Sequence, residues 1–364
     1  MGVQVRQRTI ILQTIRKMIQ KISGILISLA LFTLGCSNQR EEPILLKSDP
    51  SFNVGPSNII GVNHIGLSVN DLGKAVNFYK QSAGLSLVSD RQAIDHPFSV
   101  ISKEELSGQM QILQGPNTSI RIMEFDQKDS GRFSEMLEVQ GPGVTHICYI
   151  GPKAQPIDGR FVKNGATWES SSNAMVNMRG VGYMYGYLRD PDGLMLEIEH
   201  APEPNFRGQL WFGHVATAVM DLTKTMEFYE RMLGFPHYRR ADNREGPTYD
   251  QVAGVENVKI HGAWFRVAPF YSLEFWQFLS PKPEPPSRIK SPNEIGYNLI
   301  ALETTDVDAE FNRLNSLGIP FETEILDVLD GRAFYFRDLD GNLLAFMEFN
   351  PGSNLSLKAT ISNK

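Results

Sequence analysis

The chain of 364 residues is poor in cysteine, in long apolar runs and in positive charge. It has two cysteines, Cys36 and Cys148, too few for a disulfide-rich scaffold. The apolar stretch at residues 22–32 is too short to span a bilayer as a helix of the mature protein. Acidic residues outnumber basic ones by 41 to 35, giving a formal net charge of −6, which disfavours a nucleic-acid partner.

The N-terminal 35 residues have the pattern of an export signal. Residues 1–21 carry five basic residues and no acid, and the short apolar stretch follows. Leu34 and Gly35 precede Cys36, which resembles the lipobox of bacterial lipoproteins, in which the cysteine is lipidated and becomes the new N-terminus. A start at Met18 would leave a shorter signal of the same kind. We therefore expect residues 1–35 to be removed and the protein to be exported and membrane-anchored through Cys36.

Two consequences follow from that expectation. Loss of five basic residues and no acid changes the net charge from −6 to −11. If Cys36 is acylated, Cys148 is alone and no intramolecular disulfide can form. Secretion without an anchor, or a soluble protein without a signal, are the alternatives.

The rest of the chain contains a tandem repeat. His64 and His214 are each followed by Asp after seven residues, by Phe-Tyr after fourteen and by Gly after twenty. Glu124 and Glu274 are also 150 residues apart, and an Arg-Asp-x-Asp-Gly motif occurs at 189–193 and again at 337–341. The chain therefore consists of two similar halves.

Each half divides into two modules with the order strand, helix and about three strands. The modules lie at about residues 59–126, 144–199, 210–278 and 295–349. We expect a tether at 36–58, a first domain at 59–200, a linker at 201–209, a second domain at 210–350 and a tail at 351–364.

Strand alternation predicts which side chains share a face. It separates a set of acids and imidazoles from the apolar residues that flank them in each strand, and buried acids require a compensating charge such as a cation. The set is His64, Glu124, His146 and Glu197.

These features resemble the vicinal oxygen chelate superfamily, which includes glyoxalase I and extradiol dioxygenases. The resemblance covers residues 59–349 and implies an α+β fold of four βαβββ modules that form two paired cupped sheets. His64, Glu124, His146 and Glu197 match the four metal-ligand positions of glyoxalase I.

The second half departs from that pattern. Asn298 stands where the second histidine is expected and Ala345 where the last glutamate is expected, although His214 and Glu274 remain. We therefore predict that the first half holds the metal and that the second half has a degenerate site. This requires modules adjacent in sequence to pair; pairing one with four and two with three would split the predicted ligands.

Two imidazoles and two carboxylates suit one divalent ion, and Zn²⁺, Ni²⁺, Mn²⁺ and Fe²⁺ all remain open. The resemblance implies a glyoxalase-like lyase or isomerase acting on a small oxygen-chelating substrate, with Glu124 or Glu197 as the catalytic base. Tyr187, Arg179 and Cys148 are candidates for lining the substrate site.

Two alternatives remain. The segment from Tyr187 to Glu197 resembles an extradiol dioxygenase pattern, which would imply an Fe(II) ring-cleaving enzyme. The protein could instead be a lipoprotein that binds a metal or small molecule without catalysis. We expect a monomer or a homodimer.

Overall fold

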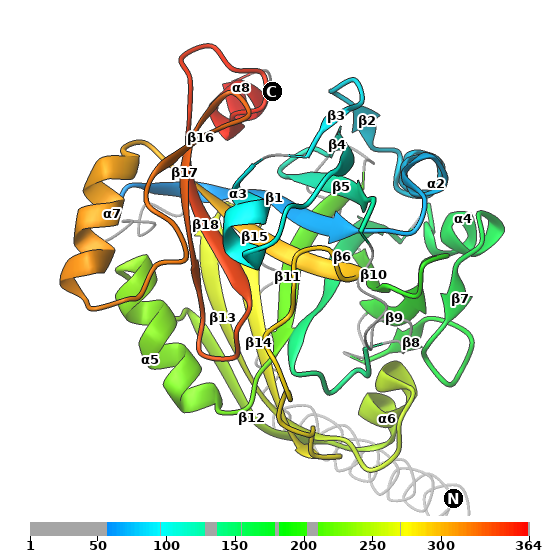
Figure 1. Ribbon diagram of the computed structural model, residues 1–364. Coiled ribbons are helices and arrows are strands. Elements are labelled where there is room, and N and C mark those ends of the chain that lie inside the picture. Colours follow the sequence, from blue (N-terminus) through cyan, green and yellow to red (C-terminus); the bar gives the residue numbers. More distant parts are fainter. Residues whose placement is uncertain are drawn as a thin grey trace, which may run out of the picture. The chain divides into compact units, whose positions relative to one another are not determined.

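The strands of this protein form two sheets, and each sheet takes strands from both halves of the chain (Figure 1). The computed structural model describes residues 57–94, 96–127, 137–153, 155–178, 182–201, 210–269 and 271–362. The lipidation candidate Cys36 and the lining candidate Arg179 lie outside these residues. None of the helices in the described ranges has the length and apolar character needed to span a bilayer.

Modules one and two contribute the first ten strands. Module one comprises β1 (Ile59–Ser68), α2 (Leu72–Ala83), β2 (Ser86–Leu87), β3 (Gln92–Ala93), α3 (Pro97–Ser102), β4 (Gly108–Gln114) and β5 (Ser119–Phe125). Module two comprises β6 (Gly143–Pro152), α4 (Asp158–Lys163), β7 (Thr167–Trp168), β8 (Val176–Asn177), β9 (Met184–Arg189) and β10 (Met195–Ala201).

Modules three and four follow the same order. Module three comprises β11 (Trp211–Ala218), α5 (Leu222–Leu233), β12 (Arg239–Glu245), α6 (Pro247–Ala253), β13 (Lys259–Ala268) and β14 (Tyr271–Ser280). Module four comprises β15 (Gly296–Thr304), α7 (Val307–Ser316), β16 (Leu326–Val328), β17 (Gly331–Arg337) and β18 (Leu343–Phe349), and α8 (Leu357–Ser362) follows it. The predicted α+β fold of four modules is confirmed.

The prediction that modules one and two form one sheet, and modules three and four the other, is wrong. One sheet, the outer-module sheet, has the order β16-β17-β18-β15-β1-β5-β4-β2, with β3 also paired to β4, and combines modules one and four. The inner-module sheet has the order β12-β13-β14-β11-β6-β10-β9-β7, with β8 paired to β9, and combines modules two and three. The two halves of the chain are therefore not two separate sheets.

The apolar character of one face of modules one and four accounts for this pairing. On the concave face of the outer-module sheet, apolar residues of modules one and four form one buried cluster, which includes Met123 and Phe125 from β5 and Tyr335 and Met347 from module four. Pairing these modules buries their apolar faces together. The histidine- and glutamate-bearing strands of modules two and three then pair with each other in the second sheet.

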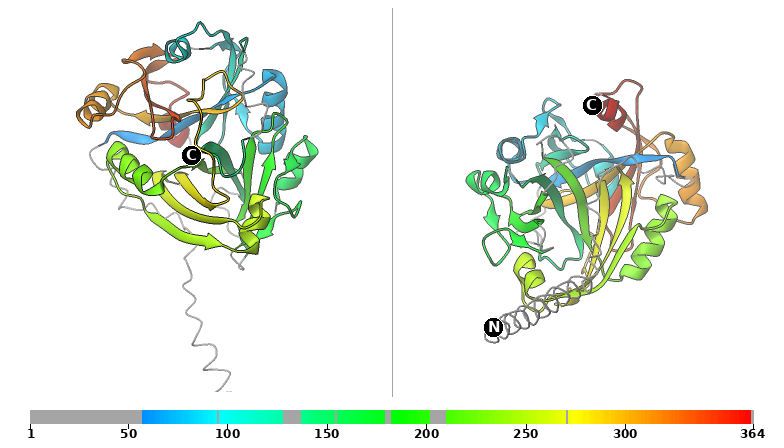
Figure 2. Two further views of the ribbon diagram at one scale, coloured as in Figure 1. Left: turned by 60° about the horizontal axis from the view of Figure 1, so that its bottom comes forward. Right: turned by 180° about the vertical axis from the view of Figure 1, so that it is seen from behind.

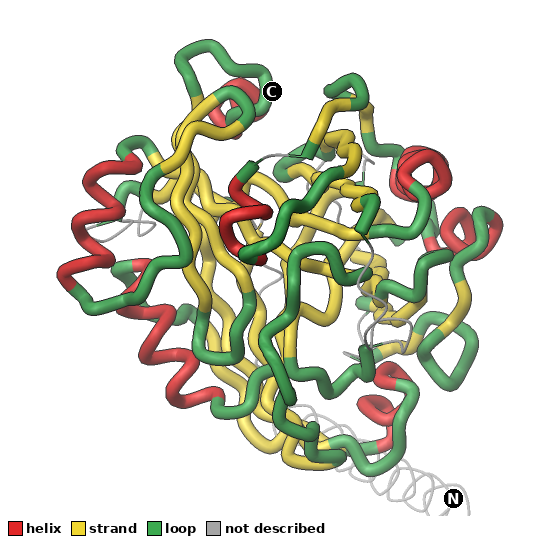
Figure 3. Tube along the Cα trace, in the orientation of Figure 1, coloured by secondary structure: helices red, strands yellow, loops and turns green. Residues whose placement is uncertain are grey.

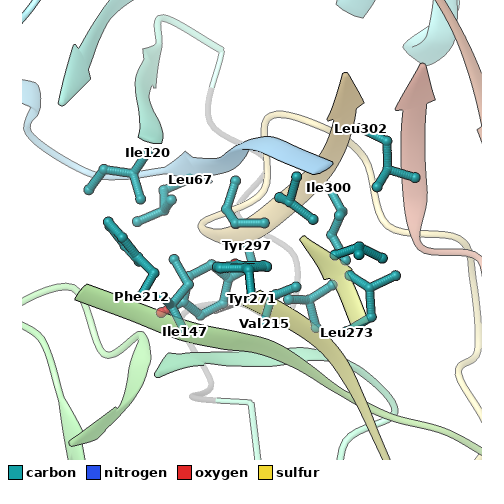
Figure 4. Packing of buried hydrophobic residues seen from close by; sticks show 14 of the residues in the cluster. Leu67, Ile120, Ile147, Phe212, Val215, Tyr271, Leu273, Tyr297, Ile300 and Leu302 are labelled. Atoms are coloured by element: carbon teal, nitrogen blue, oxygen red, sulfur yellow. The ribbon is translucent and has the colours of Figure 1, made fainter. Parts of the chain in front are cut away.

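The opposite faces of the two sheets form the main core. Ile65 and Ile300 of the outer-module sheet belong to the same buried cluster as Ile147, Val215 and Leu273 of the inner-module sheet. Figure 4 shows several of these side chains meeting between the sheets. The histidines alternate with these residues along their strands and therefore lie on the other face of each sheet.

The Asp and Gly residues that recur after each histidine in the sequence are the caps of the long helices α2 and α5. The Asp71 side chain accepts a hydrogen bond from Lys74 N at 2.9 Å and caps α2, which ends at Gly84 in the left-handed conformation (φ 70°). Asp221 and Gly234 do the same for α5. Helices α2 and α4 lie together on one flank of the molecule and α5 and α7 on the other, as Figures 2 and 3 show from several directions.

Buried tyrosine–aspartate hydrogen bonds connect these helices to the next module. The Tyr79 hydroxyl on α2 donates to Asp190 Oδ2 at 2.8 Å, and Tyr229 on α5 donates to Asp338 Oδ2 at 2.9 Å. Asp190 Oδ1 also accepts from the amides of Asp192 and Leu194. Burial raises the pKa of Asp190 to about 7, against the opposing effect of these hydrogen bonds.

This pKa predicts how Asp190→Asn changes stability with pH. Because the folded-state pKa is raised, the stabilisation from neutral Asp190 is fully present below about pH 4 and is lost as the pH rises through 7. Asparagine stays neutral and keeps the Oδ1 acceptor. Between pH 5 and 8 the unfolding free energy of Asp190→Asn should therefore rise relative to wild type by on the order of 3 kcal/mol.

Urea denaturation at a series of pH values measures this difference. Asp192→Asn, which removes a carboxylate from the same turn, is the control. Parallel pH profiles for wild type and Asp190→Asn would contradict the account.

Candidate metal centre

Four polar side chains meet on the concave face of the inner-module sheet because of how β6 and β11 pair. These central strands are antiparallel, with Ala216 opposite His146 and His214 opposite Cys148. Strand β10 runs parallel to β6 and places Glu197 beside Cys148, and β14 runs parallel to β11 and places Glu274 beside Ala216. Each module thus supplies one histidine and one glutamate by the same register.

The four side chains lie close enough to bind one ion. His214 Nε2 is 2.7 Å from Glu197 Oε2 and 3.0 Å from Glu274 Oε2. His146 Nε2 is 3.1 Å from Glu197 Oε2, 3.7 Å from Glu274 Oε2 and 3.3 Å from His214 Nε2. One donor atom from each residue lies within 4.8 Å of the others. Ligands about 2.1 Å from an ion lie about 3 Å apart when adjacent and about 4 Å apart when opposite, so this geometry fits.

Neighbouring groups orient three of the four side chains. Thr145 Oγ1 donates to Ala216 O at 3.3 Å and lies 3.1 Å from His146 Nδ1, so it can accept the Nδ1 proton and leave Nε2 to face the cluster. The Trp264 indole N–H donates to Glu274 Oε1 at 2.5 Å. Cys148 hydrogen-bonds to His214.

The charges of the cluster balance one another in a buried environment. His146, Glu197, His214 and Glu274 are 1, 5, 9 and 5% exposed. Burial lowers the pKa of His214, but the charges of Glu274 and Glu197 and the hydrogen bond to Cys148 outweigh it and raise that pKa well above its ordinary value. Burial raises the pKa of Glu274, but the two histidines lower it by more, so the pKa of this carboxyl lies below its ordinary value. A divalent cation would take the place of the imidazole protons, so its binding would release them.

The donor set therefore fits a divalent metal ion. Imidazole nitrogens and carboxylate oxygens are ligands of Zn²⁺ and of the other first-row divalent metals, and they do not select one of them. His146, Glu197, His214 and Glu274 would hold the ion.

The structure separates two of the four predicted ligands from this cluster. His64 lies on the concave face of the outer-module sheet, 2% exposed, and its Nε2 has no hydrogen-bond partner among the described residues. Asn298 donates to Ser68 Oγ and Pro292 O, and Ala345 has no ligand atom in its side chain. The prediction that His64 and Glu124 join His146 and Glu197 is wrong because modules one and two are in different sheets.

Glu124 was also assigned to the wrong face. It points to the helix side of β5, where its Oε2 accepts from Leu72 N at the start of α2. In module three the corresponding hydrogen bond runs from Leu222 N, at the start of α5, to Gln277 Oε1. Gln277 is 55 residues after Leu222, whereas Glu124 is 52 residues after Leu72. Module three is thus three residues longer, and the 150-residue spacing of Glu124 and Glu274 is a coincidence.

The register instead makes Arg121 the counterpart of Glu274. Arg121 pairs with Gly66, two residues after His64, as Glu274 pairs with Ala216, two residues after His214. A buried guanidinium in place of a carboxylate opposes cation binding. Phe98 on α3 also packs onto this face against Phe125 and Tyr335.

The substrate-lining candidates have separate outcomes. Tyr187 lies opposite Glu197 on β9, and its ring centroid is 4.9 Å from that of His146. Cys148 is fully buried beside His214, and burial raises the pKa of its thiol well above the usual value. Sequence reasoning placed His214 and Glu274 in a degenerate site and did not assign Trp264 a role there. Strand alternation around His214 was the available signal.

Comparison with known proteins agrees with this fold. A sequence model described as the Glyoxalase/Bleomycin resistance protein/Dioxygenase superfamily matches residues 211–346. Lactoylglutathione lyase of Schizosaccharomyces pombe is 20% identical over 293 residues, which cover 73% of this chain and 89% of that protein.

Solved structures show the same likeness over most of the chain. Glyoxalase I from Zea mays aligns with a TM-score of 0.53 and 17% identity, covering 79% of this chain and 92% of that one. A putative dioxygenase from Bacillus subtilis aligns with a TM-score of 0.55 and 18% identity, covering 81% and 87%. Residues 211–346 therefore match the glyoxalase/bleomycin resistance protein/dioxygenase superfamily in sequence, and the described chain is similar in fold to glyoxalase I.

Proposed function

We propose that the protein is a divalent-metal-dependent lyase or isomerase of the glyoxalase type, with its active site on the inner-module sheet. The observation that supports this most is the convergence of His146, Glu197, His214 and Glu274 within 4.8 Å. A bound divalent ion would act as a Lewis acid on neighbouring oxygens of a small substrate.

The two glutamates differ in how firmly they are held. Trp264 anchors Oε1 of Glu274, whereas the hydrogen bonds of Glu197 within the described chain are to the two histidines. Glu197 is therefore the carboxylate that is freer to move and to act as the base. It would accept a proton from a hydroxyl-bearing carbon next to a carbonyl, as the electron pair moves onto the carbonyl oxygen. It would then return this proton to the former carbonyl carbon while the hydroxyl proton passes to the neighbouring oxygen, so that a carbonyl re-forms on the first carbon.

The cluster predicts a specific pattern of metal retention. Purified protein should hold about one divalent ion per chain, and His214→Ala or Glu274→Gln should weaken binding by at least about 100-fold because each removes a ligand. Trp264→Phe should weaken it by about 10- to 100-fold through loss of the orienting hydrogen bond.

Elemental analysis and competition with a chelator measure these effects. His64→Ala and Glu124→Gln are matched controls, because they remove the same residue types from the outer-module sheet. Loss of metal in these controls, with retention in His214→Ala, would sink the assignment.

Because Trp264 anchors Glu274 but not Glu197, we make a second prediction, for the catalytic rate at saturating metal. Thiol adducts of 2-oxoaldehydes are suitable trial substrates, and solvent-deuterium incorporation into the product reports proton transfer. Glu197→Gln should lower the rate by about 100- to 10,000-fold, the range for loss of a general base, and Glu274→Gln should lower it less. The opposite ranking would show that Glu274 is the base.

A ring-cleaving dioxygenase is less well supported by this site. Four protein ligands leave fewer open positions than the three of the two-histidine, one-carboxylate iron sites that activate O₂. O₂ uptake on catechols by the iron-loaded protein would favour the dioxygenase, and metal retention without turnover of either substrate class would favour a binding protein.

We also propose that the protein is exported and anchored through Cys36. The basic N-terminal segment, the apolar stretch and the Leu-Gly-Cys sequence support this. When the full chain is produced in bacterial cells, the wild type should sediment with membranes and Cys36→Ser should not. Equal partitioning of the two proteins would contradict anchoring.

A further inference from the structure

The edge strand β12 of the inner-module sheet places a guanidinium on the same face as the cluster of His146, Glu197, His214 and Glu274. Arg239 on β12 is directly opposite Trp264 on β13, and Trp264 is directly opposite Glu274 on β14. Residues directly opposite each other on paired strands share a face of the sheet. Arg239 and Glu274 are two strands apart, about 10 Å at the usual strand spacing.

Aromatic stacking holds this side chain over the sheet. The Arg239 guanidinium carbon lies 4.3 Å from the centre of the Trp264 ring, whose N–H donates to Glu274. Trp264 is itself fixed by an edge-to-face contact with Trp276, with centroids 5.0 Å apart. A cation stacked on an aromatic ring keeps its in-plane N–H groups available to bind an oxyanion.

The charge of Arg239 is not neutralised by the part of the chain that the structure describes. No acidic side chain there pairs with it, whereas its neighbour Arg240, which points to the other face, pairs with Asp242 at 3.1 Å. The chain as a whole has a net charge of −6, yet no acidic side chain of the described residues pairs with this arginine near the four-residue cluster, so its guanidinium is available to an anionic ligand.

A second guanidinium lies in the adjacent row. Arg266 is opposite Ser272, which pairs with His214, and its guanidinium carbon is 4.4 Å from the centre of the Tyr238 ring. On the other side of the cluster, Glu199 follows Glu197 on the same face of β10. Arg239 and Arg266 therefore lie on the β12–β13 side of the cluster and Glu199 on the β10 side, with β14, β11 and β6 between them. Figure 1 shows the arrangement of these strands.

We propose that the substrate carries an oxyanion, a carboxylate or a phosphate, in addition to the oxygens that face the metal, and that Arg239 binds it. Arginine forms paired hydrogen bonds with both groups. The asymmetry of charge orients the substrate with its anionic end toward β12. This inference rests on the proposed function, because the metal fixes the other end of the substrate.

Equilibrium binding of simple chelators to the Zn²⁺-loaded protein tests the proposal. Three alkyl hydroxamic acids of matched length serve as probes, ending in a carboxylate, a phosphate or the neutral methyl ester of the carboxylate. Wild type should bind one or both anionic probes about 10- to 100-fold more tightly than the ester, the range expected for a charge-assisted hydrogen bond. The preferred anion identifies the class of oxyanion.

Substitutions assign the preference to one residue. Arg239→Met should abolish it while leaving affinity for the ester unchanged, and Arg239→Lys should keep part of it. Arg240→Met is the matched control and should retain the whole preference. Equal binding of ester and anions by wild type, or an unchanged preference in Arg239→Met, would overturn the proposal.

Failure of the underlying function has a different signature. If the protein does not load Zn²⁺, the metal centre itself is wrong. If the loaded protein binds none of the probes, the ion does not accept an oxygen-chelating ligand and the proposed function is wrong; in either case the inference falls with it. Tight ester binding without an anion preference leaves the metal centre intact and overturns only the role of Arg239.

Discussion

The antiparallel pairing of β6 with β11 is the interaction on which the site depends. It joins strands from the two halves of the chain and sets His146 and His214 side by side, with their Nε2 atoms 3.3 Å apart. Each of modules two and three contributes one histidine and one glutamate to the cluster. The parallel neighbours β10 and β14 then add Glu197 and Glu274 by the same register on either side. The candidate metal centre therefore forms only when modules two and three pair in the inner-module sheet.

The outer-module sheet shows what the same backbone becomes with other side chains. There β1 pairs with β15 as β6 pairs with β11, but the carboxylate position of module one holds Arg121 and that of module four holds Ala345. A fixed guanidinium and an apolar cluster take the place of a cation site, and Phe98 packs over them. Burying acids requires a cation, and burying an arginine in their place removes that requirement.

Much of the local structure could be predicted from the sequence. Strand alternation separates His64 from Ile65 and Leu67, and the Asp and Gly that recur seven and twenty residues after each histidine coincide with the caps of α2 and α5. These features depend on residues close together in the chain. The resemblance to the superfamily could also be recognised from the four modules with their histidines and glutamates, and a sequence model of the superfamily matches residues 211–346.

The partner of each module could not be predicted in this way. Sheet pairing is decided by which faces can be buried together, and here the buried residues of β5 lie more than 200 residues before those of β17 and β18. The face of Glu124 was missed for a related reason. An equal spacing of 150 residues suggested equivalence to Glu274, but the three extra residues in module three shift the register, and only the strand pairing shows it.

The central claim is that one divalent ion binds between modules two and three. Anomalous diffraction from crystals grown with Zn²⁺ tests it most directly. The account predicts a single strong peak within about 2.5 Å of the Nε2 atoms of His146 and His214 and of carboxylate oxygens of Glu197 and Glu274. A peak beside His64, or no peak among these four side chains, would contradict it.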